Sequence, residues 1–241
     1  MRGRVHIGTS GWHYKHWRGP FYPIDLKTAD MLLFYVGRLD TVEINNSFYR
    51  LPVATAVKNW YEVTPAKFCF SVKGSRYLTH MKKLKDPEPG LAKFFRPIDK
   101  LKEKLGPVVF QLPPGWQCNA ERLASFLAAL PRKHRYAFEL RDATWHNQTI
   151  YSLLCRHNAA FCIYELAGFQ SPAEITADFA YVRLHGPLGA YQGSYTREHL
   201  VGWARQIHGW RGTLKDIYIY FDNDQNGFAA LNALELKDMV A

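Results

Sequence analysis

Cysteines are few in this sequence, and their spacing argues against two common kinds of site. The 241 residues include four, Cys69, Cys118, Cys155 and Cys162, with no CxxC pair among them. Zinc sites and redox-active dithiols need closely spaced cysteines, so the sequence predicts neither. Cys69 and Cys162 lie inside apolar runs, where a free thiol behaves as a small hydrophobic side chain. We therefore expect free, structural thiols and a reducing compartment.

Long apolar runs and a leader sequence are also missing. No run approaches the ~20 residues that a membrane span needs. After Met1–Arg4 the chain passes directly into a strand pattern, without the apolar segment of a signal peptide. We expect a soluble, cytoplasmic protein with no membrane partner.

Acidic residues are in short supply. There are 21 Asp and Glu residues against 31 Lys and Arg residues, which gives a formal net charge of +10. A basic surface favours anions, nucleic acid or acidic surfaces as partners, although it does not determine the fold. The 47% of hydrophobic residues is enough for a large core and excludes a disordered chain.

Short apolar runs alternate with longer helical patterns along nearly the whole chain. Alternation of this kind is typical of βαβ units and a parallel sheet. The predicted strands are Val5–Gly8, Thr41–Asn45, Phe68–Lys73, Pro107–Leu112, Tyr136–Arg141, Ala160–Glu165, Phe179–His185 and Ile217–Asp222. The predicted helices are Thr28–Leu39, Ala54–Val63, Leu91–Leu105, Ala120–Leu130, Thr149–His157, Arg197–Gly209 and Gly227–Met239.

Eight such units within 241 residues fit a closed barrel better than an open sheet. The sequence therefore predicts an α/β fold, a single TIM-like (β/α)8 barrel domain over residues 1–241. Only about 13 residues separate the sixth predicted strand from the seventh, so helix six is expected to be short or irregular. The turn Gly8–Trp12 lacks the third glycine of a dinucleotide-binding loop, and no cofactor is predicted.

The ends of the predicted strands are unusually polar, and in such a barrel the chemistry gathers there. The period of two places alternate side chains on the inward face. Charged groups are too costly to bury at random, so this grouping predicts a ligand site. The inward set comprises Glu43, Lys73, Glu139, Arg141, Arg183, His185 and Asp222, of which Glu43, Glu139, His185 and Asp222 are the candidate catalytic residues.

A structural explanation of the same grouping stays open. Three cations, Lys73, Arg141 and Arg183, balance the three carboxylates of the set, so the charges could form an ion-pair network that only holds the barrel together.

Aromatic and basic side chains alternate in the loops that follow the strands. Loop one (residues 12–18) reads Trp-His-Tyr-Lys-His-Trp-Arg, and loop three (residues 76–85) carries four bases, a tyrosine and a histidine. Aromatic walls stack sugars or bases, and Arg and Lys hold phosphates. The alternative is that the tryptophans only cap the barrel. The run Arg132–Arg135 lies on the opposite face and is expected to be a solvated charge run. The candidate substrate-binding residues are Trp12, Asn45, Tyr49, Lys73, Gln111, Arg141, Trp145, Arg183 and Tyr191.

Seven motifs, in order along essentially the whole chain, resemble those of the YecE-like family, known as domain of unknown function 72. The resemblance implies a TIM-barrel-like fold in a bacterial or archaeal cytoplasmic protein, and it assigns no catalytic roles. The motifs are Gly8-Thr9-Ser10-Gly11-Trp12, Val42-Glu43-Ile44-Asn45-Asn46-Ser47-Phe48-Tyr49, Phe70-Ser71-Val72-Lys73, Gln111-Leu112-Pro113-Pro114, Phe138-Glu139-Leu140-Arg141, Tyr181-Val182-Arg183-Leu184-His185-Gly186 and Tyr220-Phe221-Asp222-Asn223-Asp224.

Two functions remain in view. The first is an enzyme that acts on a small anionic ligand, such as a sugar phosphate, a nucleotide or a nucleic-acid fragment. Glu139 or Glu43 would be its general base and His185 its acid, with the three cations holding the anion. A metal-dependent version is disfavoured, because those cations compete for the carboxylates. A glycosidase is disfavoured because Gln111 ends strand four, where an acid is usual.

The second function is a non-catalytic binding module for nucleic acid or another polyanion, which would use loops one and three.

Overall fold

Eight parallel strands close into a barrel in the computed structural model, which describes residues 2–241. Neighbouring strands pair in chain order, and the last strand pairs with the first to close the ring. This confirms the predicted α/β barrel of the TIM type. The strands are β1 (Arg4–Ser10), β2 (Thr41–Ile44), β3 (Cys69–Lys73), β4 (Leu105–Leu112), β5 (Tyr136–Leu140), β6 (Ala160–Leu166), β8 (Phe179–Leu184) and β9 (Asp216–Phe221).

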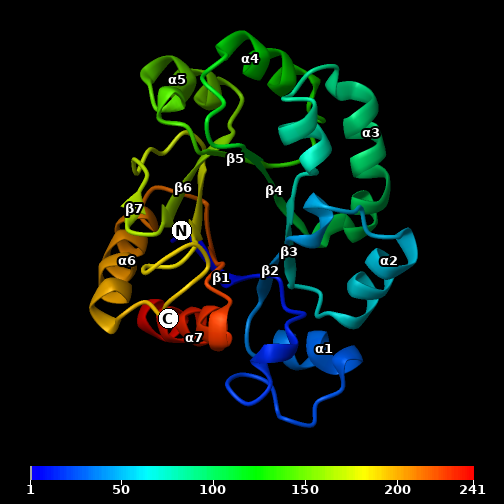
Figure 1. Cartoon of the computed structure of the whole chain (residues 1–241), viewed down its shortest axis with the longest axis vertical. Coiled ribbons are helices and arrows are strands. Elements are labelled where there is room, and N and C mark those ends of the chain that lie inside the picture. Colours follow the sequence, from blue (N-terminus) through cyan, green and yellow to red (C-terminus); the bar gives the residue numbers. More distant parts are fainter. Residues whose placement is uncertain (1) are drawn as a thin grey trace.

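Helices surround the barrel and cover its outer face (Figure 1). α2 has the predicted bounds, and α4 begins at the predicted cap, where the Asn119 side chain accepts a hydrogen bond from the Arg122 backbone at 2.9 Å. None of the helices within residues 2–241 is long and apolar enough to cross a membrane. The helices are α1 (Met31–Val36), α2 (Ala54–Val63), α3 (Pro87–Ile98), α4 (Ala120–Ala129), α5 (Gln148–Arg156), α6 (Arg197–Trp210) and α7 (Phe228–Val240).

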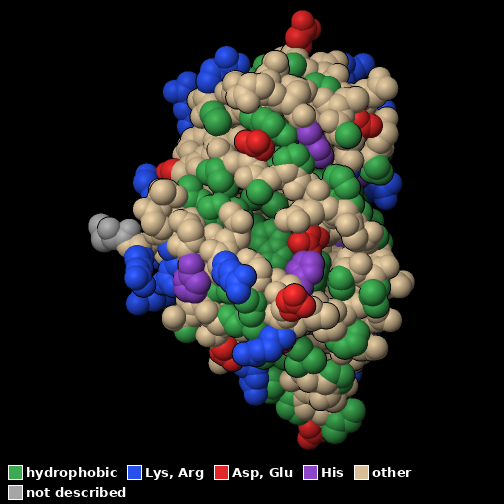
Figure 2. Space-filling view, turned by 90° about the vertical axis from the view of Figure 1, so that its left-hand side faces the viewer, with side chains coloured by type: hydrophobic (Ala, Val, Ile, Leu, Met, Phe, Trp, Pro, Cys, Tyr) green, Lys and Arg blue, Asp and Glu red, His purple; other side chains and the backbone are tan. Residues whose placement is uncertain are grey.

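The ring of helices has a gap between β6 and β8, as the short connection there predicted. In place of a helix, the chain forms β7 (Phe169–Gln170), a two-residue strand antiparallel to β6 that the sequence did not predict. Hydroxyl groups of the connection satisfy the neighbouring backbone, because Ser171 accepts from Tyr164 at 2.9 Å and Thr176 from Phe161 at 2.7 Å. A hollow of about 270 Å³ lies beside this segment, and Figure 2 shows it on the side that carries α6.

Buried side chains fill the barrel interior beneath the mouth. Large and small residues alternate, so the rings of Tyr181, Tyr218 and Tyr220 pack against Ala137 and Cys162. Buried thiols and phenols of this layer are inert, because burial raises the pKa of Cys162 and of Tyr220 well above their ordinary values. The interior is therefore a packed core, and only its two ends carry charge.

The amino-terminal end of the barrel is held by one buried carboxylate, Asp216. Its oxygens lie 2.6 Å from Arg135 Nη1, 2.9 Å from Arg4 Nε and 3.2 Å from His6 Nε2. Burial alone would raise the pKa of Asp216, but the hydrogen bonds from His6, Arg135 and Arg4 hold it well below its ordinary value. This cluster joins β1, β9 and the start of β5.

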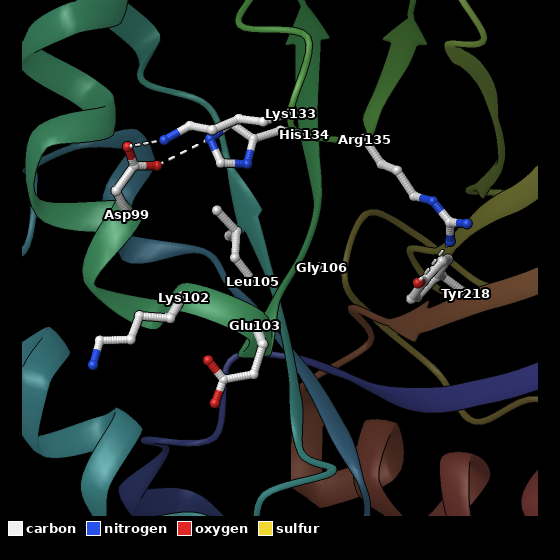
Figure 3. Close-up of a pocket in the computed structure, with 9 residues that line it drawn as sticks. All are labelled: Asp99, Lys102, Glu103, Leu105, Gly106, Lys133, His134, Arg135 and Tyr218. Carbon is white, nitrogen blue, oxygen red and sulfur yellow. Dashed lines mark hydrogen bonds and ion pairs between the residues drawn. The ribbon is translucent and has the colours of Figure 1, made fainter.

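A cavity of about 480 Å³ opens at the same end (Figure 3), and four of its charged or titratable lining residues, Asp99, Lys133, His134 and Arg135, are held in ion pairs. Figure 3 shows Lys133 and His134 directed at Asp99, at 2.6 and 2.9 Å. Since Arg135 binds Asp216, the expected solvated run is corrected: three of its four residues form ion pairs with the barrel and with the segment after α3.

We predict that Asp216→Asn lowers the free energy of unfolding at pH 7 by about 2 kcal/mol, because it leaves cations at a buried position without their counter-charge. The loss is below that of a fully buried pair, since Arg4 is largely exposed. The depressed pKa means that the carboxylate stabilises the fold above its unfolded pKa of about 4, so the difference from wild type shrinks as the pH falls below that value.

Urea unfolding at pH 7 and in acid measures both effects. Asp178→Asn is the matched control, because the partners of Asp178 are exposed, an ion pair with Lys215 and a hydrogen bond from Asn158, and the variant should lose less than about 1 kcal/mol. Equal losses in the two variants would show that the Asp216 cluster has no special role.

Candidate functional site

The carboxyl ends of the strands bring the predicted charged set together at one mouth of the barrel. Register explains the grouping: Ser10 pairs with Glu43 across β1 and β2, and Gln111 pairs with Glu139 across β4 and β5. These positions face inward because of the strand period of two. The seven predicted inward residues, Glu43, Lys73, Glu139, Arg141, Arg183, His185 and Asp222, all lie here, and all but Arg141 are buried.

Arg183 is the centre of this group and is 0% exposed. Its Nη2 lies 2.7 Å from Glu43 Oε1 and 3.2 Å from Asp222 Oδ2, and its Nη1 lies 2.6 Å from Glu139 Oε2. One guanidinium thus binds carboxylates from three strands or strand ends. Its three ion pairs mean that Arg183 holds the carboxylates in place.

Glu43 and Glu139 have no free oxygen for a ligand. Glu43 also accepts from Ser10 Oγ and, at 2.7 Å, from the Tyr181 hydroxyl. Glu139 also binds Arg141 Nε. Burial alone would raise the pKa of Glu139, but the charges of Arg141 and Arg183 hold it well below its ordinary value. Both carboxylates therefore position the arginines.

His185 is held between an acid and two bases. Its Nδ1 lies 2.9 Å from Asp222 Oδ2, and its Nε2 lies 3.1 Å from Arg141 Nη2 and 3.4 Å from Arg183 Nη1. Nε2 is also 3.3 Å from Glu139 Oε1, an oxygen already bound by Arg141. Because guanidinium nitrogens only donate, Nε2 accepts, which assigns the hydrogen to Nδ1 and directs it at Asp222.

Lys73 differs from every other charge at the mouth. It is 6% exposed, and within residues 2–241 its ammonium forms no hydrogen bond or ion pair. Its Nζ lies over the Phe48 ring, 4.5 Å from the ring centroid. Burial lowers the pKa of Lys73 to about 8, helped by Arg183 and opposed by the carboxylates. A buried cation without a counter-ion is costly, and this is the pattern of a functional site.

His80 lies close to Lys73 and to the charges of two arginines. His80 lies in the π-helical turn Tyr77–Met81, and burial together with the charges of Lys73, Arg76 and Arg141 lowers its pKa. Sequence reasoning placed His80 in loop three and did not assign it to the site. The sequence carries no clear pattern that would assign His80 to the site, because its position depends on the π-helical turn Tyr77–Met81.

Gln111 faces the same opening from β4. It is buried, and its Oε1 has no hydrogen-bond partner. Tyr191, predicted to bind substrate, packs the edge of its ring on His185 with 5.8 Å between centroids. Its backbone is left-handed, with φ +66°, a strained conformation for tyrosine. Unpaired polar atoms and backbone strain together are typical of ligand sites.

Another cavity, of about 620 Å³, lies beside the ends of β1 and β2, between loop one, α1 and α2, and two more predicted residues line it. Trp12 and Asn45 line it, and Asn45 Oδ1 is buried without a partner. Tyr14 lines the same cavity and donates a hydrogen bond to the Ser10 carbonyl at 2.7 Å, at the end of β1. The φ of +92° at Gly11 permits this close approach, because a Cβ there would lie 2.9 Å from the Tyr14 hydroxyl.

Two predicted substrate-binding residues lie elsewhere. Trp145 is fully buried, and its indole donates to the Trp116 carbonyl at 2.6 Å, so its ring belongs to the core beneath the rim. Tyr49 is 72% exposed and lines a separate cavity of about 580 Å³ between loop three and α3. Trp17 of loop one is also fully buried, so the capping explanation holds for part of the loop tryptophans.

Within the described residues 2–241, no group of three or more His, Cys, Asp and Glu side chains is arranged to hold a metal ion. Arg141 and Arg183 bind the carboxylates of Glu43, Glu139 and Asp222, which are therefore not arranged around a common metal position.

We predict that Arg183→Met lowers the free energy of unfolding at pH 7 by about 4 kcal/mol, because three carboxylates then remain close together in the interior without their common partner. Lowering the pH to 5 should reduce this deficit, since unpaired buried carboxylates take up protons readily. Urea unfolding at the two pH values measures it. Arg122→Met on α4, whose guanidinium makes an exposed bond to the Lys83 carbonyl, is the control. A deficit that does not change with pH would contradict the account.

Comparisons with known proteins agree with this architecture. Over 98% of its length the chain is 24% identical to UPF0759 protein YunF of Bacillus subtilis (strain 168), of which it covers 94%. A crystal structure of a DUF72 family protein from Thermotoga maritima MSB8 superposes with a TM-score of 0.88 at 28% identity, over 98% of this chain and 99% of that one.

A DUF72 family protein from Enterococcus faecalis V583 has a TM-score of 0.81 at 17% identity, over 98% and 95% of the two chains, and supports the fold alone. Residues 6–241 match the model of the family described as "Protein of unknown function DUF72". The chain therefore belongs to the DUF72 family, as its strand-end motifs predicted.

Proposed function

We propose that the protein is an enzyme that binds a small anionic ligand at the carboxyl-terminal mouth of the barrel and acts on it by general acid/base chemistry. One observation carries the proposal. The three carboxylates are bound by Arg183, His185 and Arg141, whereas Lys73 has no ion-pair partner within residues 2–241 and the charges of Arg76 and Arg141 add to its own at the neighbouring His80. An anion would supply the missing charge.

Arg141 is suited to hold that anion. Its side chain is 10% exposed, its Nε binds Glu139 and its Nη2 binds His185, while Nη1 has no partner within residues 2–241. The packed side chains fix the plane of the guanidinium, with Tyr164 5.5 Å from its centre. A fixed fork with an unused donor fits a phosphate or carboxylate oxygen. Gln111 offers an amide to the same ligand.

The groups that transfer protons differ from those that the sequence favoured. Glu43 and Glu139 are closed off by their partners, so we assign them to positioning. Lys73 faces the opening and, with a pKa of about 8, exists in both protonation states near neutral pH. Asp222, which touches His185 and is less deeply enclosed than the glutamates, is the second candidate.

The ligand would extend into the cavity lined by Trp12 and Asn45. That space, about 620 Å³, suits a sugar or base attached to the anionic group, and an indole wall with an unpaired amide is a common way to bind either. A sugar phosphate or a nucleotide fits this layout.

Polyanion binding is the alternative function. Loop three presents Arg76, Lys82 and Lys83 next to the exposed rings of Tyr49 and Tyr77, and bases and rings in alternation suit a nucleic-acid strand. This surface uses neither Lys73 nor the buried acids, so it leaves the mouth unexplained.

We predict that Arg141→Ala weakens the binding of inorganic phosphate by about 10- to 100-fold, the effect of losing one charge-assisted hydrogen bond. Isothermal titration measures the binding, and circular dichroism checks the fold. The control replaces Lys82, Lys83 and Lys85 by Ala, all in loop three, and should keep its phosphate affinity. The opposite pattern, with steeply salt-dependent oligonucleotide binding lost only in the triple variant, would favour the polyanion function.

A further inference from the structure

The chain has two buried lysines among its described residues, and they differ in one respect. Lys104 is 5% exposed, and its ammonium donates to the Tyr61 carbonyl at 2.6 Å, to the Thr64 carbonyl at 2.7 Å and to Thr64 Oγ1 at 3.2 Å. Those three bonds use all three protons, which makes Lys104 structural. Lys73 is buried to the same degree and donates none of its protons.

The charge of Lys73 has no ion-pair partner within residues 2–241. Its ammonium over the Phe48 ring gains about 1–2 kcal/mol, and Nζ is not among the buried atoms that lack a partner, so it still reaches solvent at the mouth. The carboxylates that could compensate lie in the same mouth, but Arg183 and Arg141 bind them. Lys73 therefore presents an amine that donates no hydrogen bond to the described residues and that is available to a ligand at the mouth.

The backbone beneath this amine is rigid. Ser47 Oγ donates to the Lys73 carbonyl at 2.6 Å, and the Gly74 backbone donates to Val109 at 2.8 Å. Gly74 itself is closely packed, since a Cβ there would lie 2.4 Å from the Phe110 ring. The Cα of Lys73 is therefore fixed, and the Nζ position varies only within the mouth, as a reacting group requires.

We propose that Lys73 is a nucleophile that forms an imine with an aldehyde or ketone bearing a phosphate or carboxylate group. This inference rests on the proposed function and adds to it the substrate class and the reacting atom. The free electron pair of the neutral amine attacks the carbonyl carbon, and the proton lost from nitrogen goes to the carbonyl oxygen. Loss of water then leaves a C=N bond, with no oxidant or reductant consumed.

The residues around Lys73 favour both the anionic group and the carbonyl group of such a substrate. His80 packs on the same Phe48 ring as Lys73 and feels the charge of Arg141, so its ring N–H and the unused donor of Arg141 would hold the anionic group and bring the carbonyl near the amine. A pKa of about 8 against an ordinary value of 10.5 makes the neutral amine about 300-fold more abundant at pH 7 than in an exposed lysine.

Reductive trapping tests the proposal on the intact protein. Glyoxylate, an aldehyde with a carboxylate, is added with sodium cyanoborohydride, which reduces an imine to a stable secondary amine, and peptide mass spectrometry locates the modified lysines. We expect Lys73 to react at least about tenfold faster than exposed Lys85, after allowance for the weaker nucleophilicity of a less basic amine. Buried Lys104 should not react. The rate at Lys73 should rise with pH and level off above about 8.

Two controls separate the carbonyl chemistry from anion binding. Propanal has no anionic group, so the preference for Lys73 over the exposed Lys85 should be smaller with propanal than with glyoxylate, and Arg141→Ala should reduce the glyoxylate preference more than the propanal preference. Lys73→Met should abolish labelling at this position and raise the Tm, because it removes a buried unpaired charge.

Labelling of Lys73 no faster than that of Lys85 would overturn the imine proposal. If wild type still binds inorganic phosphate in that case, the anionic site stands and only the covalent step is lost. If phosphate binding is absent as well, the proposed function itself fails.

Discussion

The burial of the Arg183 guanidinium is the constraint on which the rest of the mouth depends. An arginine cannot lose its charge, so a fully buried one must be surrounded by acids. Glu43, Glu139 and Asp222 meet that requirement from β2, β5 and the end of β9. Because these strands are far apart in the barrel order, a single side chain ties opposite sides of the ring together.

Satisfying Arg183 has a consequence for the groups above it. The carboxylates are occupied by cations, and for Glu139 and Asp222 the pKa values are lowered, so both are ionised; Glu43 and Glu139 serve the interior, and Asp222 also orients His185. The cations nearer to solvent, Lys73 and Arg141, are therefore not fully neutralised. The mouth separates into a saturated inner layer, which gives rigidity, and an outer layer that still has donors to offer. This division reconciles the structural and functional explanations of the same residues, because each describes one layer.

The two ends of the barrel use charge in different ways. At the amino-terminal end, Asp216 and its three partners form a closed cluster, and the neighbouring cations pair with Asp99. At the carboxyl-terminal end, atoms such as Gln111 Oε1 and Asn45 Oδ1 remain unpaired. A buried polar atom without a partner costs free energy, so these two amide oxygens, together with the unpaired ammonium of Lys73, mark the carboxyl-terminal end as the one where a ligand is expected.

The sequence by itself determined the barrel and the membership of the inward set. Both follow from local rules: alternation of strands and helices, a period of two along each strand, and a connection too short for helix six. The tertiary structure alone decided which charges pair, because the partners of Arg183 come from residues 39 to 140 positions away and are set by the stagger of the strands. It also decided that Trp145 lies in the core, that His80 reaches the mouth and that Lys73 has no partner. Loop paths and side-chain directions settle these points, and no local pattern encodes them.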